Sequence, residues 1–200
     1  MRQVEIKSLS PGTTFFYRGL EATVLEHTGT GVFVQLNASI SHRKFGCTND
    51  WRESDLRKYL NGAFAQELTQ GHSNELMDTV TDLTAEDGTT DYGTSVDKVT
   101  LLTVDQCRKY RYIRALPDVW MWLATPASTP GGWDSNATRA GILNTVGNLF
   151  SGDASGTHGA RPAFTLPSSL TVKVSGDVGL GNFSDAELLT ELLNRQKEAS

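Results

Sequence analysis

The residues that could do chemistry are not spaced as known catalytic or metal-binding motifs require. Cys47 and Cys107 lie far apart and form no CxxC pair, so we expect neither a structural zinc site nor a disulfide framework. The segment Gly152 to Gly156 does not match the GxSxG nucleophile elbow. No HExxH or HxxxH pair occurs among the four histidines, His27, His42, His72 and His158. We therefore predict no catalytic residue, no metal and no cofactor.

An acidic stretch over residues 82–94 reads as a long surface loop. Its carboxylates are Asp82, Glu86, Asp87 and Asp91, set among threonines and glycines. They miss the alternating ligand positions of an EF-hand, and whether a Ca²⁺ ion binds this loop stays open.

The segment 127–157 has the composition of an adaptable binding surface. One large aromatic side chain supplies contact area, and short polar side chains supply hydrogen bonds. We expect the ligand-binding residues to be Trp133, Asp134, Asn136, Arg139, Asn144, Asn148, Asp153 and His158. The alternative is a long coil that packs on itself with Trp133 as its anchor.

Composition narrows the class of protein. The chain has 200 residues, of which 38% are hydrophobic, and this is enough for one domain with a real core. Its net charge of −5 gives no general attraction to nucleic acid. The N-terminus lacks the apolar region of a signal peptide, and the longest apolar run, 119–124, is too short to insert in a membrane. We expect a protein made in the cytoplasm.

The elements that must position these residues begin with strands. Three short runs, 13–18, 20–26 and 32–36, are separated by glycine-containing turns and predict an antiparallel meander. A helix should then start at Asp50, with Glu53 completing a capping box. Asn61 and Gly62 should kink the helix or split it in two. We expect its core-facing side chains to be Trp51, Leu56, Leu60 and Phe64.

The second half is expected to contain a short helix and several strands. Thr103 and Gln106 form a second capping box, which opens a helix through Tyr110. We expect Arg161 to be structural, with its guanidinium holding carbonyls of the long loop. The predicted strands are 97–102, 119–123, 158–164 and 170–174.

The C-terminal residues 176–200 are expected to form a linker and an amphipathic helix, separate from a domain over 1–175. A third capping box starts at Ser184. The apolar stripe of this helix would dock either on its own domain or on a neighbouring subunit, through Leu188, Leu189, Leu192 and Leu193.

Four segments together resemble an uncharacterised family found in phages and in gut bacteria. Residues 50–61 (DWRESDLRKYLN) resemble its W-x-x-S-x-L-R-x-W/Y-L-N helix, and residues 97–103 (DKVTLLT) resemble its D-K-V-x-L-L-S strand. Residues 122–126 (WLATP) are similar to its W-W-L-R-S-P segment, and residues 159–164 (GARPAF) resemble its closing G-V-R-P-A strand. The four matches occur in the family's order and span roughly residues 13 to 175.

This resemblance implies an α+β, C-type-lectin-like fold, related to phage tropism determinants and to formylglycine-generating enzymes. Such a fold would have antiparallel strands, two or three packed helices and a long late loop region that displays the ligand-binding surface, here residues 120–158. The enzyme branch uses a cysteine pair in the C-terminal half of its domain, and this chain has no cysteine after Cys107.

From the resemblance we expect a non-enzymatic structural protein of a phage virion, oligomeric in the particle and in contact with other virion proteins. It would decorate the capsid, or bind a host-surface glycan or protein from the tail. The alternatives are an intracellular bacterial binding module and an oxidase of the formylglycine-generating type, in which Cys47 and Cys107 would have to meet.

Overall fold

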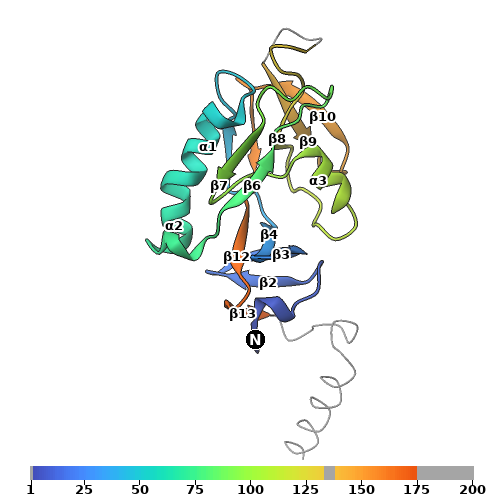
Figure 1. Ribbon diagram of the computed structural model, residues 1–200. Helices are drawn as coiled ribbons and strands as arrows, with labels where there is room; N and C mark the ends of the chain where they lie inside the picture. The colour runs from blue at the N-terminus through green and yellow to red at the C-terminus, as the bar shows by residue number, and fades with distance from the viewer. Residues whose placement is uncertain (1, 133–137, 175–200) are drawn as a thin grey trace, which may run out of the picture.

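The computed structural model describes residues 2–132 and 138–174, and it is rich in β-structure (Figure 1). Strands account for 39% and helices for 17%, and the described part contains one 15-residue helical run. The expected α+β fold with two or three packed helices is therefore wrong. The physical reason is that the described part of the Gly-, Ser- and Thr-rich second half contributes six strands to the sheets and a single short helix, α3 (Val104–Lys109).

The larger sheet has six strands in the order β1-β13-β2-β3-β4-β12, and every pairing in it is antiparallel. The predicted meander is confirmed as β2, β3 and β4. The first and last strands of the described chain lie side by side, since β1 pairs with β13. The strands are β1 (Arg2–Glu5), β2 (Thr14–Tyr17), β3 (Leu20–His27), β4 (Gly31–Leu36), β12 (Ala163–Pro167) and β13 (Thr171–Val174).

The second sheet has five strands in the order β10-β9-β8-β11-β5, and β6 and β7 form a separate hairpin. Within the second sheet β8 and β11 are paired in parallel. Long-range folding therefore brings these two strands together, because a hairpin turn can join only antiparallel strands. The strands are β5 (Ser41–Lys44), β6 (Thr79–Asp82), β7 (Thr94–Asp97), β8 (Met121–Pro126), β9 (Arg139–Leu143), β10 (Leu149–Asp153) and β11 (Thr157–Ala160).

Two strands predicted from the sequence differ in the structure. The run 158–164 is divided at Arg161 and Pro162, so that β11 belongs to one sheet and β12 to the other. The run 97–102 is mostly irregular after β7 ends at Asp97, with one isolated bridge between Thr100 and Ala163. The acidic loop predicted over 82–94 is the connection between β6 and β7.

The long helical run consists of α1 (Asp55–Tyr59), a π-helical segment η3 (Leu60–Phe64) and α2 (Ala65–Thr69). The interruption expected at Asn61 and Gly62 is therefore a π turn inside one continuous run. The amide of Asn61 donates to the Arg57 carbonyl (3.2 Å), which helps to satisfy the backbone where the hydrogen-bond pattern changes. Ser54 caps α1, while Asp50 caps the short 3-10 turn η2 (Trp51–Glu53) that precedes it.

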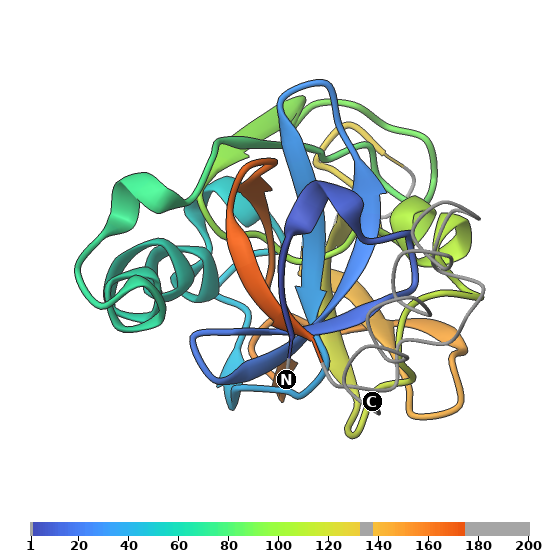
Figure 2. The same ribbon diagram turned by 90° about the horizontal axis from the view of Figure 1, so that it is seen from below.

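The α1–α2 run and α3 lie on opposite sides of the molecule (Figure 2). The α1–α2 side buries the predicted residues, since Trp51, Leu56, Leu60 and Phe64 all belong to the main core. A second core cluster lies against α3, whose Thr103–Gln106 capping box is confirmed. Three further 3-10 turns or helices are short: η1 (Ile6–Ser8), η2 and η4 (Ser73–Glu75).

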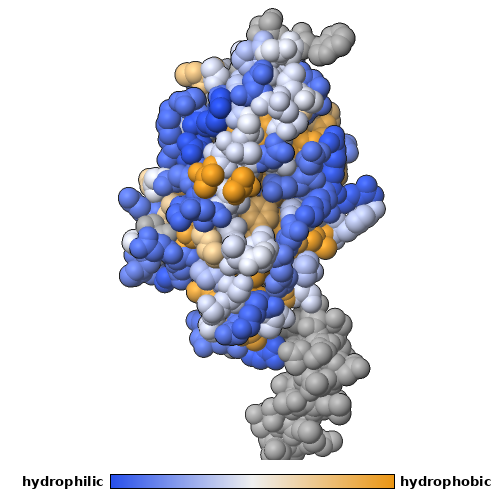
Figure 3. Space-filling view, viewed as in Figure 1, coloured by the Kyte–Doolittle hydropathy of each residue, from blue (hydrophilic) through white to orange (hydrophobic). Residues whose placement is uncertain are grey.

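The face that carries β6 and β7 is largely hydrophilic (Figure 3). Some of its hydrophobic atoms lie over that hairpin, where the cross-strand pair Val80 and Val96 is exposed. The described residues predicted to bind a ligand lie elsewhere, on β9, β10, β11 and the turn between β9 and β10.

Candidate functional site: an aromatic row at the edge of the second sheet

Three aromatic rings lie in a row where the five-stranded sheet reaches solvent. The rings of Trp120 and Phe150 have centroids 5.4 Å apart and an interplanar angle of 19°. The Trp120 ring also stacks with the imidazole of His158, with ring centroids 6.4 Å apart and an interplanar angle of 22°. Trp120 and Phe150 are each 45% exposed, although both are large apolar side chains. We call Trp120, Phe150 and His158 the aromatic row.

The order of the strands explains why these three residues meet. Trp120 directly precedes β8, Phe150 lies in the edge strand β10, and His158 lies in β11 on the other side of β8. The registers Phe150–Ile142 and Ile142–Trp122 place successive partners on one face of β10, β9 and β8. Trp120 and Trp122 are two residues apart and so share that face.

The aromatic row continues directly into the core. His158 meets the buried Trp122 ring edge-on at 4.6 Å, and Trp122 in turn lies 5.6 Å from Phe45. Phe45 then contacts Trp51 at 5.8 Å. The indole of Trp122 is further fixed by a 2.8 Å bond from its Nε1–H to the Arg43 carbonyl. A surface aromatic supported in this way is held rigid, which reduces the entropy cost of binding a ligand.

Two further exposed apolar side chains lie at the tip of the β9–β10 hairpin. Leu116 lies against the tip of the β9–β10 hairpin at Gly147, next to Val146. Both Leu116 and Val146 are exposed. Four of the exposed large hydrophobic residues of the described chain therefore come from the 116–120 segment and this hairpin.

His158 is the titratable member of the row. Partial burial, with a smaller contribution from nearby His42, lowers the pKa of the His158 imidazole below its ordinary value of 6.5. The ring is therefore neutral at neutral pH and acts there as an aromatic partner of the two tryptophans.

The structure divides the residues predicted for binding into several roles. The amide oxygen of Asn144 accepts from the backbone N–H of Val146 (3.1 Å) and of Asn148 (2.8 Å), so Asn144 shapes the hairpin tip. The Asp153 carboxylate accepts from the N–H and hydroxyl of Ser155 and holds the next turn, and these bonds lower the pKa of Asp153. Asn144 and Asp153 are thus turn-forming residues.

Arg139, Asn148 and His158 occupy positions that a ligand can reach. Arg139 and Asn148 are exposed, and Arg139 donates to the Ser151 carbonyl (2.7 Å) across the β9–β10 pair. Of these three, only His158 belongs to the aromatic row.

The long coil expected over 127–157 is in large part the β9–β10 hairpin. Trp133, Asp134 and Asn136 lie outside the described residues, as do Leu188, Leu189, Leu192 and Leu193.

Sequence reasoning missed Trp120 and Phe150 as site residues. Both lie within the segment 120–158 expected to display the binding surface, but neither was among the residues predicted to bind the ligand. The available signal was the Trp120-Met121-Trp122 alternation, which puts two large aromatics on one face of a strand. The alternation could not show that Trp120 lies just before the first residue of β8, where its side chain reaches solvent.

The cysteines do not resemble a reactive pair. Cys107 is buried, and loss of solvation raises the pKa of its thiol to about 12, so the thiolate is rare at neutral pH. Cys47 is exposed, and both thiols are free. This arrangement gives no support to the oxidase alternative.

The acidic loop uses its carboxylates for hydrogen bonds within the loop and to the segment that follows β8. Asp82 accepts from the N–H and hydroxyl of Thr84. Asp91 accepts from the Thr129 hydroxyl and from the N–H of Gly131. Over residues 2–132 and 138–174, no group of three or more His, Cys, Asp or Glu side chains is arranged to hold a metal ion.

The motifs that carry the family resemblance meet in a buried structural network. Asp97 accepts from the Trp51 indole (3.0 Å), from Arg57 Nε (2.7 Å) and from the Ser95 hydroxyl. Asn61 accepts from the N–H groups of Lys98 and Val99 and donates to the Val99 carbonyl. The helix motif and the strand motif therefore bind each other, and their residues hold the α1–α2 run against the β6–β7 hairpin.

The comparisons with known proteins give no match: no protein-family model, no curated protein and no solved structure is similar to this chain. Among the helices that the structure describes, none is long and apolar enough to span a membrane.

Proposed function

We propose that this chain is a non-catalytic binding domain that attaches to a surface ligand through the aromatic row. The observation that carries the proposal is the pair Trp120 and Phe150, stacked, half-exposed and supported from the core by His158 and Trp122. Exposed aromatic side chains held in a fixed orientation are typical affinity determinants of binding surfaces. Asn148, two residues before Phe150 in the same hairpin, is exposed and can supply a polar contact beside them.

The biological setting in this proposal comes from the family resemblance. It is a phage virion, in which the domain binds a host-surface glycan or protein or contacts other virion proteins. A glycan suits the row because sugar rings present apolar faces that lie flat on aromatic rings, with hydroxyl groups directed at polar neighbours.

The binding proposal is tested with fluorescently labelled protein on bacterial cells and on their purified surface polysaccharides. Trp120→Ala and Phe150→Ala should each weaken binding about 30-fold, which corresponds to the roughly 2 kcal/mol of an aromatic hot spot. Tyr112→Ala is the matched control, because Tyr112 is a more exposed aromatic (83%) outside the row. Equal binding by the Trp120 and Tyr112 variants would contradict the proposal.

The setting is tested separately, by asking whether the protein co-purifies with intact phage particles on a density gradient. Virion association is the expected result. A protein found only in the soluble fraction of the bacterial lysate would instead favour the intracellular binding module.

A further inference from the structure

A cavity separate from the aromatic row lies where the α1–α2 run meets the end of the six-stranded sheet. Its volume is about 290 Å³, and it shares no lining residue with the aromatic row. The walls come from the start of β3, the end of β4, the 37–40 crossover and the helical run. The apolar lining residues are Leu20, Leu36, Ile40, Tyr59 and Phe64.

The π turn is what brings the two aromatic walls together. Tyr59 and Phe64 are five residues apart, and in a regular α-helix they would point about 140° away from each other. The π segment η3 starts directly after Tyr59 and ends at Phe64, and its i to i+5 repeat turns both side chains toward one side. Their ring centroids are 6.3 Å apart. A π turn inside an α-helix is less stable than the regular helix and occurs often at functional sites.

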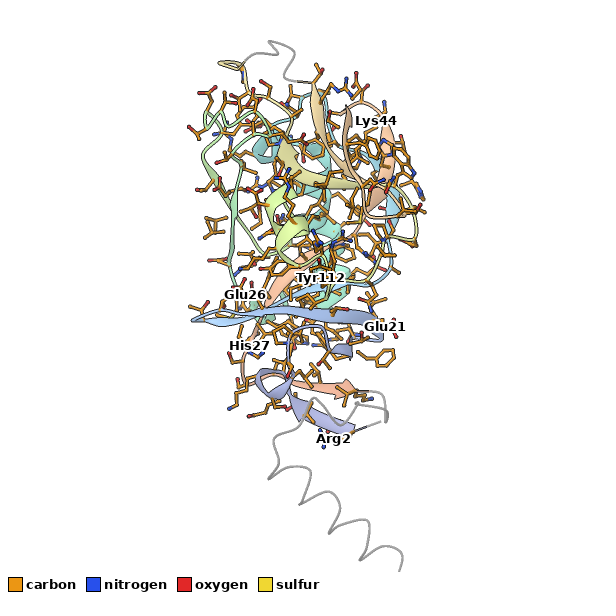
Figure 4. All side chains as sticks on the ribbon, turned by 90° about the vertical axis from the view of Figure 1, so that its right-hand side faces the viewer. Arg2, Glu21, Glu26, His27, Lys44 and Tyr112 are labelled. Carbon is orange, nitrogen blue, oxygen red and sulfur yellow. The ribbon has the colours of Figure 1, made fainter. Side chains whose placement is uncertain are left out.

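The charged residues of the cavity are both acidic. Glu21 lines it from β3 and Glu67 lines it from α2, and no Lys, Arg or His belongs to its lining. Both side chains are exposed, so they stand at the mouth while the apolar residues form the wall. Glu21 accepts a 3.3 Å bond from the amide of Asn37. Figure 4 shows Glu21 at the opposite end of β3 from Glu26 and His27.

One cation packs against the cavity's aromatic wall from outside: the guanidinium of Arg43 lies 3.5 Å from the centroid of the Tyr59 ring. Arg43 comes from β5 and lies outside the cavity lining. Its position shows that the Tyr59 ring is already used as a cation-accepting surface on its β5 side.

From this arrangement we infer that the cavity binds a small organic ammonium ion. The apolar body would lie between Tyr59, Phe64 and Ile40, and the ammonium group would sit at the mouth between Glu21 and Glu67. An apolar wall with two carboxylates at its rim favours a cationic ligand over a neutral or anionic one of the same shape.

The test uses 2-phenylethylammonium chloride as the probe and 2-phenylethanol as its neutral counterpart, each titrated into the ¹⁵N-labelled full chain by NMR. We expect saturable shifts for the ammonium ion at the backbone amides of Leu20, Ile40 and Tyr59. The neutral alcohol should bind at least tenfold more weakly.

The double variant Glu21→Gln/Glu67→Gln keeps the shape of the rim and removes its charge, and it should weaken binding of the ammonium ion at least tenfold. The matched control is Glu5→Gln/Glu53→Gln, two exposed glutamates outside the cavity with the same change in net charge. The control should bind within twofold of the unmodified protein.

Three outcomes would overturn the inference. They are the absence of saturable shifts at the cavity, equal weakening in the two double variants, and equal affinity for the ammonium ion and the alcohol. Thermal melting of each variant confirms that it is folded before its affinity is compared.

Discussion

Asp97 is the single side chain that connects most of the buried motif residues. Its carboxylate is almost fully buried and accepts hydrogen bonds from Trp51, Arg57 and Ser95, while Arg57 also forms its ion pair. A buried charge with this many donors is stabilising only as long as every partner is present.

Asp97→Ala should lower the free energy of unfolding by about 3–5 kcal/mol, because it leaves the Trp51 indole N–H and the Arg57 Nε–H without their acceptor and removes the carboxylate that pairs with the Arg57 charge. Urea denaturation measures the change. Asp105→Ala is the control: its ion pair with Arg108 is exposed, and its loss should cost about 1 kcal/mol or less. A similar cost for both variants would mean that the Asp97 network contributes little.

Arg161 is 1% exposed and joins two crossovers between the sheets. Its guanidinium donates to the carbonyls of Asn37, Ala115 and Leu116. The structural role predicted for Arg161 is confirmed, but the carbonyls belong to the β4–β5 crossover and the segment before β8, not to the late loop. Burial lowers the pKa of the guanidinium to about 10, so it stays charged at neutral pH.

Arg161→Lys should therefore destabilise the protein by about 2–3 kcal/mol, although the charge is kept, because an ammonium group cannot reach three carbonyls in a fork. Arg111→Lys, at an exposed position, should leave the melting temperature within about 1 °C. An unchanged melting temperature for Arg161→Lys would remove the role assigned to Arg161.

His158 should make stability depend on pH. Its pKa in the folded protein lies below 6.5, so the unfolded chain takes up a proton first as the pH falls. The free energy of unfolding is then fully retained above pH 6.5 and declines as the pH drops toward the folded value. His158→Gln should flatten this decline between pH 7.5 and 5.5, whereas His72→Gln, at an exposed position, should not. Identical pH profiles for the two variants would contradict the assignment.

Elements formed by local patterns of the chain could be predicted from the sequence, whereas elements that depend on pairing with distant segments could not. The meander β2–β3–β4 was predicted because its alternation and its turns are local properties of the chain. The β9–β10 hairpin was missed because Gly, Ser, Thr and Asn have the composition of a coil, and only pairing with β8 makes a strand of β9. The π turn at η3 was foreseen only as a break, because a Gly weakens a helix without specifying which hydrogen bonds replace the regular ones.

Gly62 offers a direct test of the π turn. A Cβ added there would meet nothing within 4 Å, and its φ is not in the left-handed region. Gly62→Ala should raise the free energy of unfolding by about 0.5–1 kcal/mol, since it restricts the unfolded chain at no steric cost. Gly19 is the matched control: its surroundings are equally open, but its φ is +84°, so Gly19→Ala should be destabilising. Thermal denaturation should show a higher melting temperature for Gly62→Ala and a lower one for Gly19→Ala. Loss of stability in both variants would mean that η3 is wrongly described.

On the scale of the whole molecule, the candidate site depends on contacts that no local pattern encodes. His158 meets Trp120 because β11 is inserted beside β8 in parallel, and Trp120 meets Phe150 because β9 joins β8 to β10. The region predicted from the sequence, residues 120–158, contains the aromatic row, and His158 was among the residues predicted there. It could not identify the half-exposed pair, since exposure of Trp120 and Phe150 is set by where three separate strands end.

The boundary of the domain follows from the same long-range pairing. β13 lies between β1 and β2, and it buries Val172 and Val174 in the main core. A chain that ends at residue 174 keeps all of these contacts, so its melting temperature should stay within about 2 °C of that of the full chain. A chain that ends at residue 169 loses β13, leaves β1 without a partner and exposes the core beside β2, and it should fail to fold cooperatively. Circular dichroism melts of the two truncated chains measure this difference. A large loss of stability on ending at residue 174 would show that residues 175–200 belong to the folding unit, against the division at residue 175 predicted from the sequence.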